Sequence, residues 1–306
     1  MNRFKSGVIG HAIGDALGVQ CEFSSRDYLK DYPITGFKDT DFRLGWWSDD
    51  TSMELALMDS YIKNKSFNYS DIMNNFVLWV DKGDFTPEGH CFDVGSTCYS
   101  AISYFRDSNK TPLECGLDDI NSNGNGSLMR IFPIAYYCFK KNSSILDIYS
   151  LVRDISSITH RHSVSILGCF IYVLYCIKLF EGNSKNEAYN YVKSFNYDMF
   201  DIETISYYDR ILKNDISSLD ISSIKSSGYI VDSLEASFYC LLTTDNYNDA
   251  VLKAINLGGD TDTIGAITGS MAGVIYGMEL IPDDWINTIS REDYIEELCD
   301  KFDLSI

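Results

Sequence analysis

The sequence predicts a single, largely α-helical domain. Apolar residues recur at spacings of three and four in most segments, whereas the period-two alternation of strands is weak throughout. Two segments far apart in the chain, 10–18 and 265–277, carry glycine at every fourth position, which places these glycines on one face of a helix. The 306 residues contain neither an internal repeat nor a low-complexity linker, so we expect one domain over residues 1–306.

Composition and charge restrict the classes of function. Hydrophobic residues make up 45% of the chain and charged residues 23%, which is typical of a globular protein. The formal net charge of −19 argues against binding to extended nucleic acid or to an anionic membrane, because phosphates would be repelled. A small phosphate ligand neutralised by a cation remains compatible with this charge.

The cysteine pattern and the apolar runs indicate the compartment. The nine cysteines have irregular spacings and form no CxxC pair, so we expect reduced thiols in a cytoplasmic protein. The apolar run 167–180 is short and contains Lys178, so we expect no membrane segment. A monomer is the default expectation for the oligomeric state.

The N-terminal segment 4–19 is predicted to be a helix with Gly10, Gly14 and Gly18 on one face. Glycine costs up to about 1 kcal/mol in a helix interior, so its repetition implies that another backbone comes close. The glycine face of segment 265–277 is the natural partner, and the alternative is that each face meets a different helix. The first arrangement would bring Asp15 and Glu22 toward Asp260 and Asp262.

Two short units combine hydroxyls with paired carboxylates at a predicted helix start. Ser48-Asp49-Asp50-Thr51 precedes the predicted helix 51–65, and Asp260-Thr261-Asp262-Thr263 precedes the apolar run 264–278. One such unit is an ordinary helix cap. Two units in one chain indicate the halves of a metal cluster, because a divalent cation offsets the repulsion between neighbouring carboxylates. Oxygen ligands suit Mg²⁺, and four carboxylates suffice to bridge two cations, as in two-metal hydrolytic sites.

The remaining elements follow from local pattern. Residues 23–47 look irregular, and 69–82 is predicted to be a helix. Segment 92–97 opens another helix, where Asp93 is either the N-cap, which composition favours, or a polar site group. Segment 155–180 is predicted to be helical, with Thr159-His160-Arg161-His162 near its start. Segments 228–241 and 248–257 are predicted helices, 183–226 carries short surface helices, and 282–306 carries small closing helices.

Residues 123–130, Asn-Gly-Asn-Gly-Ser-Leu-Met-Arg, form a glycine loop before an apolar helix. Such a loop lets backbone N–H groups approach a phosphate or a ribose, with Arg130 nearby. A repeated Asn-Gly is also a common turn, and composition alone favours the turn.

Taken in order, these motifs resemble the ADP-ribosylglycohydrolase family, nearly from end to end. The motifs are Gly14-Asp15-Ala16-Leu17-Gly18 with Glu22, Trp47-Ser48-Asp49-Asp50-Thr51, Phe92-Asp93-Val94-Gly95, Gly124-Asn125-Gly126-Ser127-Leu128-Met129-Arg130, Thr159-His160, Gly228-Tyr229-Ile230-Val231-Asp232 and Gly259-Asp260-Thr261-Asp262-Thr263. Each motif alone is weak, whereas the ordered set is highly specific.

The resemblance implies an all-α fold with a dinuclear Mg²⁺ site, or Mn²⁺, at converging helix N-termini. The implied metal ligands are Ser48, Asp49, Asp50, Asp260, Asp262 and Thr263, and Ser48 retains the hydroxyl where the family often has threonine. The implied substrate-binding residues are Gly95, Gly124, Asn125, Gly126, Ser127, Leu128, Met129, His160, Tyr229 and Gly259. Of these, the loop 124–129 would hold the diphosphate, and Tyr229 would lie near the adenine or a ribose. The implied catalytic residues are Glu22, as acid or base, Asp49 and Asp93.

The implied reaction is metal-dependent hydrolysis of the N- or O-glycosidic bond between ADP-ribose and an acceptor, with release of ADP-ribose. The acceptor would be an arginine or serine side chain of an ADP-ribosylated protein, or a small ADP-ribosyl conjugate, and the motifs do not distinguish them. Flanking carboxylates would stabilise an oxocarbenium-like ribose. The alternatives are an inactive ADP-ribose-binding or structural member and another Mg²⁺-dependent nucleotide or phosphoester hydrolase.

Overall fold

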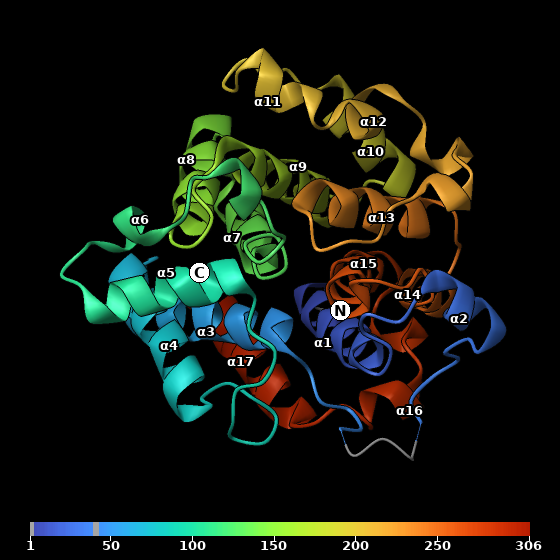
Figure 1. Ribbon diagram of the computed structural model, residues 1–306, viewed down its shortest axis with the longest axis horizontal. Coiled ribbons are helices and arrows are strands. Elements are labelled where there is room, and N and C mark those ends of the chain that lie inside the picture. Colours follow the sequence, from blue (N-terminus) through green and yellow to red (C-terminus); the bar gives the residue numbers. More distant parts are fainter. Residues whose placement is uncertain (1–2, 39–42) are drawn as a thin grey trace.

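The helices of this protein are arranged around one central pair, α1 and α15 (Figure 1). The structure is a computed structural model that describes residues 3–38 and 43–306. Within these residues it contains no strand, only two isolated backbone bridges, Leu117 with His160 and Gly124 with Tyr229. The all-α prediction is therefore confirmed.

The α-helices are α1 (Arg3–Val19), α2 (Arg26–Asp31), α3 (Asp49–Asn64), α4 (Tyr69–Lys82), α5 (Ser96–Asp107), α6 (Pro112–Cys115), α7 (Phe132–Lys141), α8 (Ile145–Ser157), α9 (Ser163–Phe180), α10 (Lys185–Ser194), α11 (Ile202–Ser206), α12 (Asp209–Lys213), α13 (Ile230–Leu242), α14 (Tyr247–Ile255), α15 (Thr261–Tyr276), α16 (Asp283–Ile286) and α17 (Glu292–Ser305). Four short 3₁₀ turns complete the described elements: η1 (Ile120–Ser122), η2 (Ile216–Ser218), η3 (Ile221–Ser223) and η4 (Met278–Leu280).

Helices α1 and α15 cross with their backbones in direct contact through glycine. A Cβ atom on Gly14 would overlap the carbonyl of Gly265, and a Cβ atom on Gly10 would overlap the carbonyl of Gly269. The predicted pairing of the two glycine faces is thus confirmed. Gly277 does not belong to this face, because it is the C-cap of α15, with a φ of +79°.

The same crossing brings the end of α1 to the start of α15. A Cβ atom on Gly18 would overlap the backbone of Asp262. Beyond α1, the Phe23 N–H donates to the Gly259 carbonyl at 2.8 Å, and the Gly259 N–H donates to the Ser24 carbonyl at 2.9 Å. These contacts fix the segment after α1 against the segment before α15.

A buried aspartate on α1 also holds the start of α3. Asp15 accepts hydrogen bonds from the Ser48 N–H at 2.9 Å, the Thr51 N–H at 3.1 Å and the Thr51 hydroxyl at 2.6 Å. A carboxylate is favoured at a helix N-terminus, where amide donors lack partners within the helix. Asp15 is therefore a structural group that joins α1 to α3.

The predicted continuous helix over 155–180 is wrong. Helix α8 ends at Ser157 and α9 begins at Ser163, and the segment between them is extended enough for His160 to pair with Leu117. The His162 side chain accepts from the Val164 N–H and so caps α9. The break carries neither glycine nor proline, which are the usual punctuation of a helix end. Its consequence is that His160 lies in a loop.

Two smaller predictions also need correction. The segment 23–47, expected to be irregular, contains α2, whose N-cap Ser25 accepts from the Tyr28 N–H, and residues 39–42 of this segment lie outside the described ones. The closing segment 282–306 contains α17, which at 14 residues is not a small helix.

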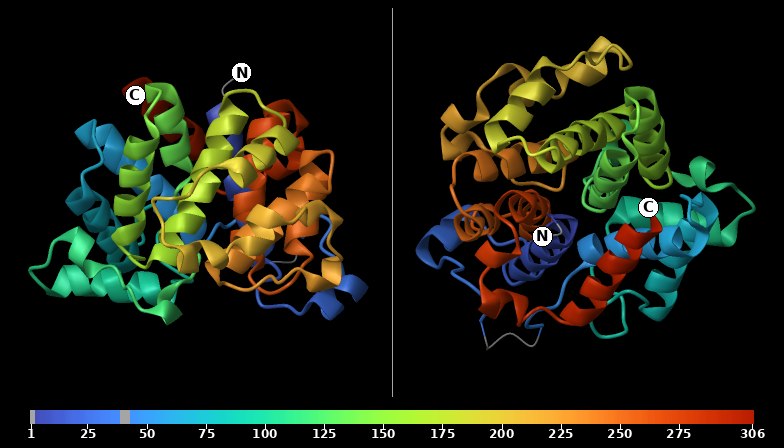
Figure 2. Two further views of the ribbon diagram at one scale, coloured as in Figure 1. Left: turned by 90° about the horizontal axis from the view of Figure 1, so that it is seen from above. Right: turned by 180° about the vertical axis from the view of Figure 1, so that it is seen from behind.

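Two groups of helices flank the central pair. Figure 2 shows α9 to α13 on one side and α3, α4, α5 and α17 on the other. Helix α9 has a mean hydropathy of 2.0 over its 18 residues, so by length and composition it could cross a membrane. However, 89% of this helix is buried inside the protein. Its composition is that of a core helix. All nine cysteines are free, and Cys91 is the one that is not fully buried.

Candidate active site

A cavity of about 470 Å³ opens where the ends of α1, α3, α5, α13 and α15 converge. This volume lies in the range of small-molecule sites. The residues that line it come from seven parts of the chain and include five carboxylates but no lysine or arginine. They are Glu22, Phe23, Asp49, Asp93, Gly95, Ser96, Thr97, Cys98, Gly124, Asn125, Gly126, Met129, His160, Ser227, Gly228, Gly259, Asp260, Asp262 and Thr263.

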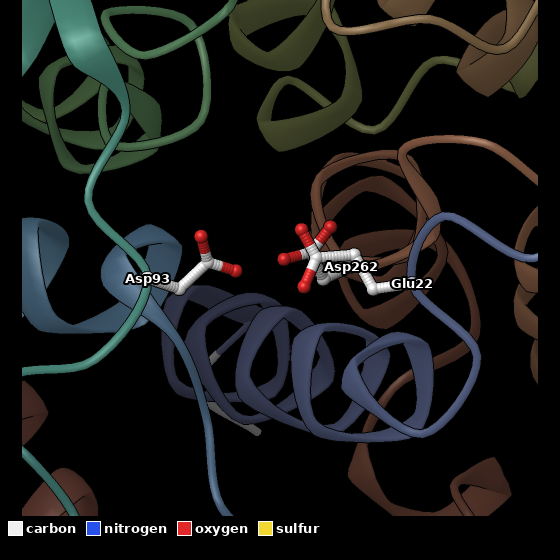
Figure 3. Close-up of side chains that lie close together, drawn as sticks. All are labelled: Glu22, Asp93 and Asp262. Atoms are coloured by element: carbon white, nitrogen blue, oxygen red, sulfur yellow. The ribbon is translucent and has the colours of Figure 1, made fainter.

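Three of these carboxylates face one another across the cavity. Glu22 follows α1, Asp93 lies in the loop before α5, and Asp262 lies in the first turn of α15 (Figure 3). One carboxylate oxygen from each lies within 4.8 Å of the others. Burial, a hydrogen bond to Asp93 and the charges of neighbouring aspartates raise the pKa of Glu22 to about 9. Such a cluster stays fully ionised only beside a positive charge.

Behind this cluster, the starts of α3 and α15 meet directly. Asp50 Oδ2 accepts from the hydroxyls of Ser48 and Thr263, each at 3.2 Å. Asp50 Oδ1 and Asp262 Oδ1 are buried without a hydrogen-bond partner within the described residues. Burial and the charges of nearby aspartates raise the pKa of both carboxyl groups well above the ordinary value.

These unpartnered oxygens fit a hard divalent cation, since a buried carboxylate without a partner is costly and Mg²⁺ prefers oxygen ligands. Of the six predicted metal ligands, Asp49, Asp260, Asp262 and Thr263 line the cavity. Ser48 and Asp50 are buried immediately behind them. All six thus lie together, and their role as ligands stays a prediction.

Of the two alternatives for Asp93, a helix cap and a polar site group, the structure favours the second, because Asp93 lines the cavity. The N-cap position of α5 belongs to Gly95, which has no side chain to cap with, and the Gly95 N–H donates to Asp49 Oδ2 at 3.4 Å. Asp93 has a φ of +53°, an uncommon conformation for a residue with a side chain. Positive φ values outside glycine gather at functional sites.

The glycine loop 123–130 borders the cavity and is fixed by the start of α13. Asn125 donates from its side chain to Asp260 Oδ2 at 2.6 Å and from its backbone N–H to the Gly228 carbonyl at 3.0 Å. Gly124, Gly126 and Met129 line the cavity with Asn125. The loop is therefore a turn that also forms a wall of the site.

Four residues expected around this loop do not line the cavity. Ser127 and Leu128 are fully buried, and the Ser127 hydroxyl contacts Cys169 Sγ at 3.3 Å. Tyr229 is partly buried and pairs with Gly124 through its backbone. Arg130, which was expected near a phosphate, does not line the cavity: its side chain is fully buried and donates to carbonyl and hydroxyl acceptors, one of them the carbonyl of the lining residue Gly126.

Sequence reasoning missed six lining residues: Phe23, Ser96, Thr97, Cys98, Ser227 and Gly228. Most of them are sequence neighbours of residues that were predicted to belong to the site, and this proximity was the signal that could have identified them. Phe23 is the most informative of them. It is 78% exposed and has a φ of +58°, so an aromatic ring stands at the rim beside Glu22.

Comparisons with known proteins agree with this geometry. A family model described as ADP-ribosylglycohydrolase matches residues 1–306. An ADP-ribosylarginine hydrolase of Pseudomonas putida (strain GB-1) is 31% identical over 98% of this chain and 77% of its own length. An ADP-ribosyl-dinitrogen reductase glycohydrolase of Rhodospirillum rubrum is 27% identical over 93% of this chain and 89% of its own. The solved structure of an "ADP-ribosylglycohydrolase-related protein complex" has the same fold, with a TM-score of 0.81 at 24% identity, and covers 100% of this chain and 98% of that one.

Proposed function

We propose, from the premise that this chain belongs to the ADP-ribosylglycohydrolase family, that it hydrolyses the bond between ADP-ribose and the arginine side chain of a modified protein. Hydrolysis of a glycosidic bond is the activity of the family and of its named relatives. The observation that carries the proposal is the convergence of Glu22, Asp93 and Asp262 on one cavity. Carboxylates that flank the anomeric carbon stabilise the positive charge that develops on the ribose.

The charge of the cavity supports arginine as the acceptor. Its lining contains five carboxylates and no lysine or arginine, which favours a positively charged guanidinium leaving side. The exposed ring of Phe23 beside Glu22 adds a surface on which a cation is attracted to the face of an aromatic ring. Two relatives at 31% and 30% identity are named ADP-ribosylarginine hydrolases.

Two Mg²⁺ ions would be held by the six grouped side chains Ser48, Asp49, Asp50, Asp260, Asp262 and Thr263. When bound, such ions neutralise neighbouring carboxylates and lower the pKa of water. The chain itself contributes the positions of the reacting groups. Asn125 orients Asp260 through its 2.6 Å hydrogen bond, and the Gly95 N–H orients Asp49.

Glu22 is the proposed proton donor to the leaving nitrogen. Its carboxyl faces Asp93 and Asp262 inside the cavity, and it extends from a segment fixed by the paired backbone of Phe23 and Gly259. Asp93 lies on the opposite side of the cavity and forms a hydrogen bond with the Glu22 carboxyl group, which orients it. A general acid of this kind contributes about 10²- to 10⁴-fold to the rate.

The test is release of ADP-ribose from an arginine-ADP-ribosylated protein and from a serine-ADP-ribosylated peptide, with Mg²⁺ and with EDTA. We expect Mg²⁺-dependent release from the arginine substrate, with slower release from the serine peptide. As a control, Asp245→Asn should release ADP-ribose like the wild type, because this aspartate is 98% exposed in its side chain and lies outside the cavity. Faster release from the serine peptide would reject arginine as the acceptor. Release of phosphate or AMP would reject hydrolysis of the glycosidic bond.

A further inference from the structure

Arg130 is a buried cation that the proposed reaction does not use. It is fully buried, and within the described residues it forms no ion pair with a carboxylate. Its guanidinium donates from Nη1 to the Gly126 carbonyl and from Nη2 to the Ile155 carbonyl at 3.3 Å. It also lies 5.3 Å from the centre of the Phe76 ring. A buried charge of this kind destabilises the folded state through desolvation, so we asked what its contacts position.

A further contact of Arg130 leads to the cavity through Thr159. Arg130 Nη2 lies 2.7 Å from Thr159 Oγ1, and Thr159 Oγ1 lies 2.8 Å from His160 Nδ1. A guanidinium only donates hydrogen bonds, so the Thr159 oxygen must accept from it. The single proton of the Thr159 hydroxyl is then available to a second partner.

His160 Nδ1 is the best acceptor for that proton. The nearby alternative is the sulfur of Cys98, which interacts with the Thr159 side chain but is a weak acceptor. An imidazole nitrogen that accepts a hydrogen bond carries no proton of its own, so in the neutral ring the proton lies on the other nitrogen. The contacts of Thr159 therefore select the tautomer of His160.

The backbone around His160 leaves the ring little freedom to avoid this contact. The His160 N–H donates to the Ser156 carbonyl at 2.8 Å, and the Ser156 hydroxyl donates back to the His160 carbonyl at 2.9 Å. The Leu117 N–H holds the Thr159 carbonyl at 3.0 Å. Burial, with a smaller contribution from the charge of Arg130, lowers the pKa of His160 to about 3, which agrees with a neutral ring.

The second ring nitrogen faces the glycine loop. A Cβ atom on Gly124 would lie 3.6 Å from His160 Nε2, and one on Gly126 would lie 3.5 Å from it. Nε2 has no hydrogen-bond partner of its own in the part of the chain that the structure describes, although His160 lines the cavity. It is thus aimed at the space that the loop encloses.

We propose that Arg130 acts through Thr159 to hold His160 as the neutral tautomer with its proton on Nε2. The cavity then presents a fixed N–H donor beside the glycine loop, suited to an acceptor oxygen of a phosphate or ribose. Arg130 and Thr159 are positioning residues. The identity of the ligand rests on the proposed function, whereas the tautomer is a property of the free protein.

The experiment is ¹⁵N NMR of histidine-labelled protein, in which the two ring nitrogens give different shifts for each tautomer. His162 serves as an internal reference, because its Nδ1 accepts from the Val164 N–H at 3.2 Å and lies 3.0 Å from the Asn123 amide nitrogen. We expect the wild-type protein to show protonated Nε2 on His160, and Thr159→Ser to preserve it. Thr159→Val should give a mixture of tautomers, with the His162 signals unchanged.

Affinity for ADP-ribose, measured by calorimetry, is the second readout. Loss of one fixed donor should weaken binding about threefold to tenfold in Thr159→Val and leave it unchanged in Thr159→Ser. Protonated Nδ1 or a charged ring in the wild type overturns the inference, and so does an unaltered tautomer in Thr159→Val. If Thr159→Val does not fold, the spectra of the wild type and of Thr159→Ser still show whether His160 carries its proton on Nε2. Absence of ADP-ribose binding by the wild type would reject the proposed function and leave the tautomer result standing.

Discussion

Glu22 and Asp262 lie 240 residues apart in the sequence, and each carries a carboxyl group into the same small volume. Neither group has a basic side chain beside it in the cavity lining. Residues selected for stability alone would not be gathered in this way, because like charges at short distance raise the free energy of the folded state. The cluster is therefore evidence for a ligand of positive charge.

Replacement of Glu22 by glutamine tests the role of a single proton. Glu22→Gln keeps the size of the side chain and removes the acid, so we expect kcat to fall by about 10²- to 10³-fold. Affinity for ADP-ribose should stay within about threefold, because the variant retains a polar group at the same place. Steady-state kinetics and calorimetry separate the two effects. A large loss of affinity with kcat unchanged would assign Glu22 to binding.

Asp262→Asn separates metal binding from catalysis by thermal melting. In EDTA the variant should melt at or above the temperature of the wild type, because it removes a buried carboxyl with an unpartnered oxygen. The rise in melting temperature that Mg²⁺ gives the wild type should be lost, since ligand binding to the folded state is what produces it. Asp245→Asn should respond to Mg²⁺ like the wild type. An unchanged Mg²⁺ response in Asp262→Asn would remove Asp262 from the metal ligands.

Among the elements, the glycine contact between α1 and α15 was predictable and the break between α8 and α9 was not. Gly10 and Gly14 share a face by spacing alone, and their cost in a helix demands a close neighbour. The break at 158–162 depends on Leu117, which is distant in sequence and pairs with His160 through the backbone. Backbone pairing leaves no side-chain signature, so the sequence carried no sign of it.

The site also has features that could be predicted from the sequence and features that could not. The carboxylates could be predicted because the chain contains two units that each combine hydroxyls with paired carboxylates at a helix start, and a divalent cation offsets the repulsion within such pairs. The direction of Arg130 could not, because the sequence places it at the end of the glycine loop and only the packed structure shows which side the guanidinium faces. Tyr229 does not line the cavity and forms a backbone bridge to Gly124, so its place beside the adenine or a ribose stays a prediction.

Gly14→Ala tests the helix crossing. The added methyl group would overlap the carbonyl of Gly265, and both partners are backbone, which cannot move aside as a side chain can. We expect a loss of about 1–3 kcal/mol in the free energy of unfolding, despite the better helix propensity of alanine. Asn190→Ala on the exposed surface of α10 is the control and should stay within about 0.5 kcal/mol. Urea unfolding measures both, and a stabilised Gly14→Ala would contradict the close crossing.

For the whole molecule, the acidic cluster couples stability to pH. Burial raises the pKa of Asp15 to about 6 and that of Glu22 to about 9, above the values in the unfolded chain. A raised carboxyl pKa favours the folded state below the unfolded value and loses this contribution as the pH rises through the folded value. The buried His11 and His160, whose pKa values are lowered to about 3, act in the opposite direction, but only below pH 6.5.

Between pH 6.5 and about pH 8.5 the carboxylates should therefore set the trend, and the buried cysteines, whose pKa values burial also raises, add to it in the same direction at the upper end. In EDTA the melting temperature should fall by several degrees over this interval. Saturating Mg²⁺ should reduce the fall, because bound cations stabilise the ionised cluster. Scanning calorimetry at both ends of the interval, with and without Mg²⁺, provides the measurement. A melting temperature that rises with pH in EDTA would contradict the burial of these groups as carboxylic acids.

The crossing of α1 with α15 also bears on when the protein becomes active during its synthesis. A ribosome that has released α1 and α3 has made Glu22 and Asp49 but not yet Asp260 or Asp262, and α1 still lacks the helix against which its glycine face packs. The cavity cannot form until α15 leaves the exit tunnel. The nascent chain therefore stays enzymatically silent at least until that point.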